Sequence, residues 1–219
     1  MTPTLAQVLS TLAHEIRTPL AVSRGYLKLL QDGGLPSAAD QRSALERTQE
    51  ALGVISTLCQ DMGKVGAVAG IQAPRALEGR LTVSELRDAL TATMGEDAPE
   101  WRGRISPGRL VATNGTDDIV RAVATLGTMA FKDASGARRV AQARMHDASL
   151  VLVIGGEAAT DSLPPDPEAE GAAGVPVVRG GFGLSLMWAA FVLDQHRVRT
   201  WHHADGRGAV GFLFPLVNA

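Results

Sequence analysis

The strongest constraint on the fold is a pair of long helical patterns separated by the helix-breaking run Gly33-Gly34-Leu35-Pro36. Apolar residues in the first pattern, about residues 3 to 32, are spaced four, three, four and four: Leu5, Leu9, Leu12, Ile16 and Leu20. The second pattern, about residues 37 to 68, carries two stripes: Leu45, Thr48, Leu52, Ile55, Cys59 and Met62, then Ala51, Leu58 and Val65. Because two stripes exceed what one partner helix covers, we predict a four-helix bundle built from the hairpins of two copies, a homodimer.

Composition limits the classes of partner and compartment. The 219 residues carry a net charge of −2, which gives no general attraction to nucleic acid or anionic lipid. No apolar run is long enough for a membrane span and no secretory signal is present, so we expect a cytoplasmic protein. Cys59, the single cysteine, cannot form an intramolecular disulfide, and its place on an apolar stripe predicts burial.

The chain after the hairpin predicts an α+β domain. We expect domains at residues 1–68 and 81–219, joined by a Gly-, Ala- and Pro-rich linker at 69–80. Thr82 to Glu85 reads as a capping box that opens a helix. The remaining pattern predicts helices over 82–94, 116–132 and 182–195, strands over 109–113, 137–145, 149–154, 198–203 and 209–215, and a mobile loop over 156–180.

His14 is the candidate reactive residue of the hairpin. At roughly 100° per residue it lies about 160° from both Leu12 and Ile16, so it should point away from the apolar stripe toward water. An exposed imidazole beside the carboxylate of Glu15 suits a nucleophile that must reach another molecule. Pro19, which lacks an amide hydrogen, should loosen or bend the helix beyond the histidine.

The run His14-Glu15-Ile16-Arg17-Thr18-Pro19-Leu20 resembles the phosphoacceptor box of bacterial sensor histidine kinases. The resemblance implies that His14 carries a phosphoryl group and that Glu15 accepts its proton. Thr18 falls where family members orient water to dephosphorylate a partner, and Arg17 and Pro19 fall where a partner would bind. Leu5 lies only a few residues before this helix, so we expect no sensor domain ahead of it and input from another protein.

The second domain resembles the ATP-binding domain of the same kinases, with its ligands replaced. Gly181 and Gly183 stand in a run similar to the second glycine box, which binds phosphates at a helix N-terminus. Aligning the helix 116–132 with the family places Met129 at the metal-binding asparagine and Thr125 at the earlier one. Gly155 stands at the adenine-binding aspartate.

Two glycines that follow this aspartate in the family are replaced by Glu157 and Ala159. Losing the aspartate and the metal asparagine would cost about 3–6 kcal/mol of binding free energy, or about 10²–10⁴ in affinity. We therefore expect neither nucleotide nor metal on this chain. Other candidates are weaker: His202 and His203 on one strand point to opposite faces, so they read as surface histidines.

A retained histidine and a lost ATP site predict a histidine phosphotransferase of a bacterial phosphorelay. His14 would pass phosphate between the aspartates of response-regulator receiver domains, which would supply the Mg²⁺ themselves. Two alternatives stay open: an autophosphorylating histidine kinase with a divergent ATP site, and a pseudokinase scaffold that carries no phosphate.

Overall fold

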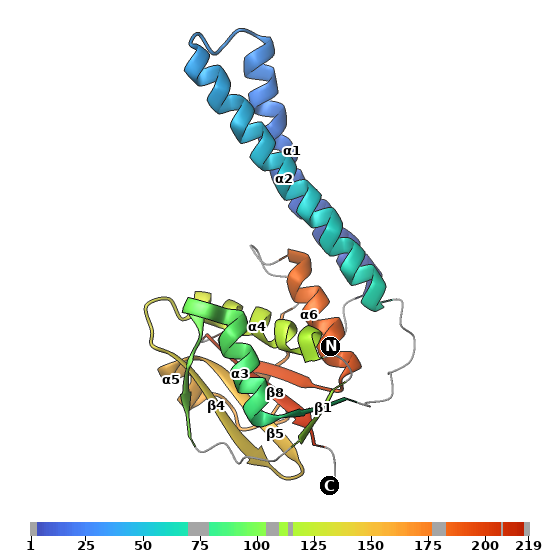
Figure 1. The fold of residues 1–219 in the computed structure, drawn as a ribbon, viewed down its shortest axis with the longest axis vertical. Coiled ribbons are helices and arrows are strands. Elements are labelled where there is room, and N and C mark those ends of the chain that lie inside the picture. Colours follow the sequence, from blue (N-terminus) through green and yellow to red (C-terminus); the bar gives the residue numbers. More distant parts are fainter. Residues whose placement is uncertain are drawn as a thin grey trace.

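The N-terminal part of the chain is a helical hairpin that projects from a compact α+β domain (Figure 1). The structure, a computed structural model, describes residues 4–69, 79–103, 110–113, 116–176, 183–206 and 208–216. The hairpin consists of α1, Leu5–Gln31, and α2, Ala38–Ala69. Thr4 and Gln7 form a capping box at the start of α1, and Ser37 accepts the amide hydrogen of Asp40 at the start of α2. No helix among the described residues combines the length and hydropathy that a bilayer span needs.

Small side chains, rather than the leucine stripes, line the contact between α1 and α2. The buried residues of the hairpin are Val8, Thr11, Pro19 and Ser23 on α1 and Ala44, Thr48, Ala51 and Val65 on α2. Of the stripes predicted to face inward, Leu5, Leu9, Leu20, Leu45 and Leu52 are 44–69% exposed. Cys59 is also exposed, so the prediction that it is buried is wrong for a single chain. Small residues let the two backbones approach closely, which leaves the larger side chains on the outside.

The hairpin helix is not interrupted at Pro19. α1 continues from Leu5 to Gln31 with Pro19 inside it. Pro19 therefore does not end the helix, its ring is buried, and the predicted loosening or bend stays a prediction.

A mixed six-stranded sheet forms the centre of the second domain, with the strand order β2-β4-β5-β8-β7-β6. Its strands are β2 Glu100–Arg102, β4 Arg139–His146, β5 Ser149–Gly156, β6 Ala172–Ala173, β7 Arg199–His203 and β8 Ala209–Pro215. A separate ribbon pairs β1, Gly79–Thr82, with β3, Leu110–Thr113. The helices are α3 Val83–Met94, α4 Thr116–Asp133, α5 Glu157–Ser162 and α6 Gly183–Gln195, with a 3₁₀ turn at Gly95–Asp97. The predicted order of elements is confirmed, apart from the additional β1, β2, α5, β6 and 3₁₀ turn.

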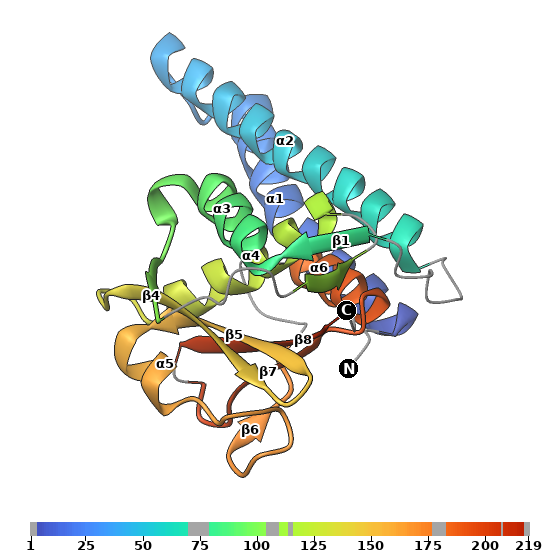
Figure 2. The same ribbon diagram turned by 60° about the horizontal axis from the view of Figure 1, so that its bottom comes forward.

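Alternate residues of β5 serve two separate hydrophobic clusters. Leu150, Leu152 and Ile154 belong to the main core with the helices α3, α4 and α6, which lie on one side of the sheet (Figure 2). Val151 and Val153 belong to a smaller cluster on the other face, with Leu163, Trp201, Ala209 and Leu213. The sheet is therefore covered on both faces.

Residues 156–176 form this second cover and are not the mobile loop that the sequence predicts. The indole of Trp201 is fully buried and donates to the carbonyl oxygen of Pro164 at 2.9 Å. Arg144 donates to the carbonyl oxygen of Pro165 at 3.0 Å, and Arg199 pairs with Glu168 at 2.5 Å. Residues 177–180 of the predicted loop lie outside the described residues.

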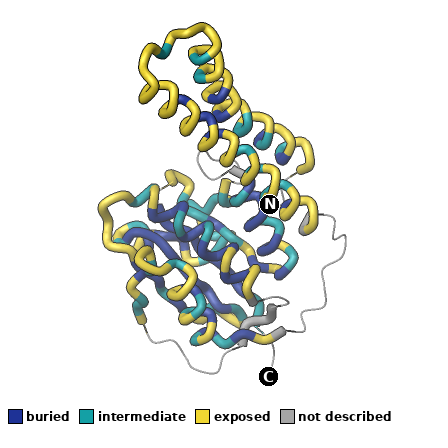
Figure 3. The backbone as a smooth tube through the Cα atoms, turned by 45° about the horizontal axis from the view of Figure 1, so that its top comes forward, coloured by how far each residue is buried: buried dark blue, intermediate teal, exposed yellow. Residues whose placement is uncertain are grey.

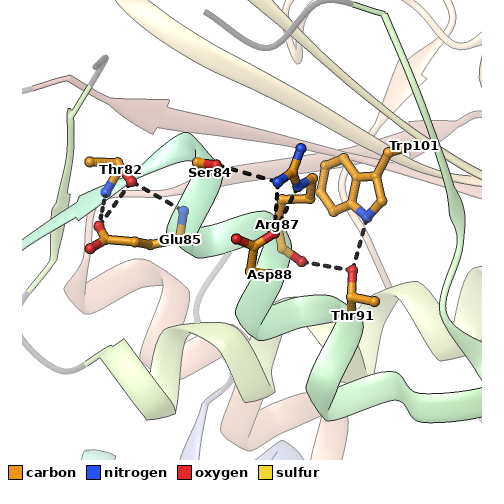
Figure 4. Close-up of polar contacts among 7 residues, drawn as sticks. All are labelled: Thr82, Ser84, Glu85, Arg87, Asp88, Thr91 and Trp101. Carbon is orange, nitrogen blue, oxygen red and sulfur yellow. Dashed lines mark hydrogen bonds and ion pairs between the residues drawn. The ribbon is translucent and has the colours of Figure 1, made fainter. Parts of the chain in front are cut away.

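The start of α3 is fixed by the predicted capping box (Figure 4). Thr82 Oγ1 accepts from the backbone of Glu85, whose carboxylate accepts from the backbone amide of Thr82 at 2.8 Å. This backbone hydrogen bond, followed by the Thr82 hydroxyl, lowers the pKa of Glu85. Farther along, the indole of Trp101 donates to Thr91 Oγ1 at 3.2 Å and connects β2 with α3.

The base of the hairpin and the second domain share one hydrophobic core. Val8 of α1 and Val65 of α2 are 2% and 1% exposed, and they belong to the same buried cluster as α6, α4 and the sheet. Leu12 and Met62 pack against that cluster. Figure 3 shows the contrast, with a largely exposed distal hairpin and a buried domain interior. The two domains are therefore joined by packing as well as by the chain between them.

Candidate functional site

His14 lies on the exposed side of α1, as its sequence position predicts. Arg17 and Thr18, three and four residues later, are also exposed and share its face of the helix. Pro19 is buried, so in this hairpin Arg17 rather than Pro19 is available to a partner. The arrangement presents one nucleophilic imidazole, one cation and one hydroxyl on a common face.

Glu15 lies on a different face of the same turn. Thr11 and Pro19, four residues before and four after, are both buried in the hairpin, so Glu15 belongs to the partly buried stripe that faces α2. Partial burial raises the pKa of the Glu15 carboxyl, and the nearby charge of His14 lowers it by a smaller amount. A carboxylate with a raised pKa binds a proton more tightly, which suits a proton acceptor next to a nucleophilic imidazole.

A shallow groove follows His14 along α1 toward the tip of the hairpin. Its lining residues come from the C-terminal half of this helix: Ala21, Val22, Gly25, Tyr26, Lys28, Leu29 and Asp32. Val22 and Leu29 are 41% and 45% exposed. Because its lining combines the small residues Ala21 and Gly25 with the apolar Val22 and Leu29, it is a surface on which another helix could pack.

Met129, which the sequence alignment places at the family's metal-binding asparagine, is inaccessible on α4. Met129 is 3% exposed and belongs to the main hydrophobic core. Its thioether is a poor ligand for Mg²⁺, which prefers oxygen, and its burial removes it from any bound phosphate. Thr125 is half-buried, and its hydroxyl donates to the carbonyl oxygen of Arg121 at 2.8 Å.

Gly155, which the sequence alignment places at the adenine-binding aspartate, is closed in by backbone. Gly155 lies on β5 opposite Ala209, and a Cβ atom there would be 2.5 Å from both Ala209 Cα and the carbonyl oxygen of Gly208. A Cβ on the next residue, Gly156, would lie 2.7 Å from the Cβ of Ala134 at the end of α4. An aspartate side chain does not fit at Gly155 unless the strands move apart, so these residues do not suit an adenine nucleotide.

Glu157, which replaces the first glycine of that box, has a structural partner instead. Arg102 of β2 forms an ion pair with Glu157, and its other terminal nitrogen lies 3.8 Å from a carboxylate oxygen of Asp161. Sequence reasoning did not find this cluster, because Arg102 and Glu157 are 55 residues apart and no local pattern relates them. Ala159, at the second glycine position, packs against the outer cluster of the sheet.

One cavity of about 440 Å³ remains between the hairpin and the second domain. Its walls include Thr125 and Thr128 of α4, Ser185 and Trp188 of α6, and Lys64 of α2. Neither Met129 nor Gly155 lines it. Gly183 begins α6, while Gly181 lies outside the described residues, so the second glycine box is described only in part.

No cluster of three or more potential metal ligands occurs within the part of the chain that the structure describes. His202 Nε2 lies 3.1 Å from the carbonyl oxygen of Gly174, whereas His203 Nδ1 lies 2.7 Å from a carboxylate oxygen of Asp205. The two histidines have different partners, and both are half-buried rather than fully exposed.

Comparison with known families identifies the hairpin. Residues 4–64 match the His Kinase A (phospho-acceptor) domain, so the chain carries this phosphoacceptor domain. The match includes His14, Glu15, Arg17, Thr18 and Pro19. No curated protein matched the sequence.

Solved structures extend the likeness to the fold of the whole chain. The histidine kinase AdeS of Acinetobacter baumannii is 17% identical and has a TM-score of 0.59, over 94% of this chain and 98% of AdeS. Full-length ShkA, in complex with AMPPNP, is 18% identical with a TM-score of 0.52, over 100% of this chain and 47% of ShkA. The histidine kinase ThkA, in complex with the response regulator protein TrrA, is 15% identical with a TM-score of 0.51, over 96% and 60%. The chain therefore has a histidine kinase-like fold from hairpin to sheet.

The closed adenine position gives the first prediction. Replacing Gly155 with Asp, the residue at the aligned position in kinases, should destabilise the protein by about 3 kcal/mol or more, because the new side chain clashes with the backbone of β8. Urea unfolding followed by circular dichroism measures this loss. Gly53→Asp is the matched control, since a Cβ at Gly53 meets nothing within 4 Å. A Gly155→Asp protein as stable as the wild type would show that the position is open.

Proposed function

We propose that this chain, which carries a His Kinase A phospho-acceptor domain on a histidine kinase-like fold, is a histidine phosphotransferase of a bacterial two-component phosphorelay. His14 takes a phosphoryl group from an aspartyl phosphate on one receiver domain and gives it to the aspartate of another. The chain does this without binding ATP. The Mg²⁺ that neutralises the phosphoryl oxygens belongs to the receiver.

One contrast carries the proposal. The phosphoacceptor histidine is exposed on the hairpin, whereas two positions that hold ATP and its metal in kinases are filled by the buried Met129 and the enclosed Gly155. Accepting a phosphoryl group from another protein needs only the exposed histidine. Taking it from ATP also needs the nucleotide and metal positions of the second domain. Phosphotransfer between proteins is the activity that such a chain retains.

The transfer is a substitution at phosphorus. A lone pair on a ring nitrogen of His14 attacks the phosphorus of the aspartyl phosphate, and the bond from phosphorus to the carboxylate oxygen breaks, with its electrons leaving on the aspartate. Glu15 takes the proton from the imidazole as its positive charge develops. In the second half-reaction a receiver aspartate attacks the phosphohistidine, and Glu15 returns the proton to the leaving imidazole. Thr18, exposed on the same face, would orient water where net flow runs toward dephosphorylation.

The receiver would dock along the groove that begins beyond His14. Val22 and Leu29 offer apolar contact, and Arg17 and Lys28 offer positive charge beside it. This surface is continuous with the nucleophile along one helix, so a docked receiver could place its aspartate close to the imidazole.

A second copy of the chain would cover the other exposed apolar faces of the hairpin. Seven large apolar side chains of α1 and α2 outside that groove are 44–69% exposed in the single chain: Leu5, Leu9, Leu20, Leu27, Leu45, Leu52 and Val54. Such an extent of exposed apolar surface is unusual for a monomer and typical of an interface. An isologous hairpin pair would give the four-helix bundle predicted from the sequence.

The second prediction tests the phosphotransfer itself. Incubation of the full chain with a phosphorylated receiver domain should place acid-labile phosphate on the protein, detected on Phos-tag gels and mapped to His14 by mass spectrometry. His14→Ala should abolish the label. His202→Ala is the matched control, because it removes a histidine from the second domain and should leave labelling unchanged.

Two outcomes would favour the alternative functions. If isothermal titration calorimetry shows micromolar Mg·ATP binding and ATP labels His14, the chain is an autokinase. If no receiver labels it and His14→Ala retains signalling in cells, the chain is a scaffold.

The third prediction concerns the proton acceptor. Glu15→Gln should slow transfer by about 10²-fold, the lower end of the range for general acid–base catalysis. Because the pKa of Glu15 is raised, the wild-type transfer rate should fall on acidification at a pH above 4.5, the ordinary pKa of a glutamate. The Glu15→Gln variant should lack this fall. Rapid-quench transfer assays across pH measure both, with the receiver's own dephosphorylation rate recorded at each pH.

The stability of the same variant separates catalysis from folding. Because the folded-state pKa of Glu15 is raised, the folded protein binds this proton more tightly than the unfolded chain. The free energy of unfolding therefore falls as pH rises from the unfolded-state pKa of Glu15 through its folded-state pKa. Glu15→Gln removes this effect and should be at least as stable as wild type at pH 7. A variant that is slow only because it unfolds would contradict the assigned role.

The fourth prediction concerns the dimer. Leu52→Glu puts a charge on a leucine that is 52% exposed in one chain and buried in the proposed bundle, so it should convert the dimer to a monomer at micromolar concentration. Sedimentation velocity measures the change. Gln60→Glu, on an exposed position of the same helix, should remain dimeric. A wild-type protein that sediments as a monomer would exclude the bundle.

A further inference from the structure

The helix α6 has no polar face, although it lies at the surface of the second domain's fold. Seven of its thirteen residues are at most 8% exposed: Leu184, Leu186, Met187, Trp188, Ala189, Val192 and Leu193. At about 100° per residue these positions point in nearly every direction around the helix. A helix that is apolar all round is stable in water only when neighbours cover every side.

Two sets of neighbours cover α6, one from each domain. α4 packs along it from the second domain, and α1 and α2 contact it from the hairpin. Figures 1 and 2 show α6 between the base of the hairpin and the sheet. Without the hairpin, one side of this apolar helix would be exposed to water.

The hairpin side of this contact is as well buried as the interior of the domain. Val8 and Val65 are 2% and 1% exposed, and both fall in the cluster that extends to Phe212 and Phe214 of β8. The distal hairpin differs, because its buried positions beyond Thr11 and before Val65 are small or polar side chains. The base of the hairpin is thus the part that packs like a domain core.

We propose that α6 acts as a third helix of the hairpin's base, so that hairpin and second domain form one cooperative folding unit and the second domain stays docked. A domain that carries ATP to a histidine must leave one position on the hairpin and occupy another. If the second domain of this chain left its observed position against the hairpin, Val8, Val65 and the covered side of α6 would all be exposed to water. The second domain is therefore a fixed buttress beside the phosphoacceptor helix. This inference stands on packing alone and does not depend on the proposed phosphotransfer.

Native-state hydrogen exchange of the full chain, read by mass spectrometry on Val65→Ala, tests the coupling. Truncating this buried valine should accelerate the slowest amides of β5 and β8 by about tenfold or more. The amides of α6 and of the hairpin base should accelerate by the same factor, because all of them exchange through one opening. Gln60→Ala, at an exposed position of the same helix that the proposed bundle does not bury, should leave the exchange of β5 and β8 unchanged.

The opposite pattern overturns the proposal. If Val65→Ala accelerates exchange only within the hairpin while β5 and β8 keep their wild-type protection, the domains are independent units. Calorimetry of the wild-type protein gives a second reading that needs no variant. One heat-absorption transition, with calorimetric and van't Hoff enthalpies equal at a fixed protein concentration, is expected, and two separable transitions would refute the shared unit.

Discussion

The burial of α6 between two domains determines how the parts of this molecule are placed. An apolar helix with no polar face needs cover on every side, and the sheet side supplies only part of it. The base of the hairpin supplies the rest through Val8 and Val65, with Leu12 packed against the same core. His14 comes two residues after Leu12 in the helix, so the reactive imidazole lies just beyond this core. The hydrophobic contact that fixes the second domain therefore also fixes its position relative to the phosphoacceptor.

The order of elements could be predicted because its signals are local. The capping box at Thr82 and Glu85, the Gly33-Gly34 turn and the apolar run of β5 each specify structure within a few residues. The helices that these signals predict begin and end within about two residues of the observed bounds. The exposure of His14 followed from the same periodicity.

Local patterns could not predict which surface covers each apolar face, or which residues far apart in the sequence meet. Periodicity shows that a helix has an apolar face, but not whether that face meets its own chain or another copy. The chain's own helix pair uses small residues such as Ala44 and Ala51, and the larger leucines remain outside. The cover over residues 156–176 depends on Trp201, which meets Pro164 at a separation of 37 residues. The pair of Arg102 with Glu157 spans a still longer separation, and no local pattern relates its members.

In the proposed mechanism, the residues that activate His14 all lie in the hairpin, which leaves the nucleotide site of the second domain free to diverge. His14 and Glu15 are adjacent in sequence but about 100° apart on the helix, so one faces water while the other faces α2. The partial burial that raises the pKa of Glu15 arises within the hairpin, where Thr11 and Pro19 flank it. The second domain need not contribute to that environment. In the proposed phosphotransferase this domain need not hold ATP, so Met129 can fill the aligned metal position and Gly155 can close the strand, and both pack the domain that contacts the hairpin.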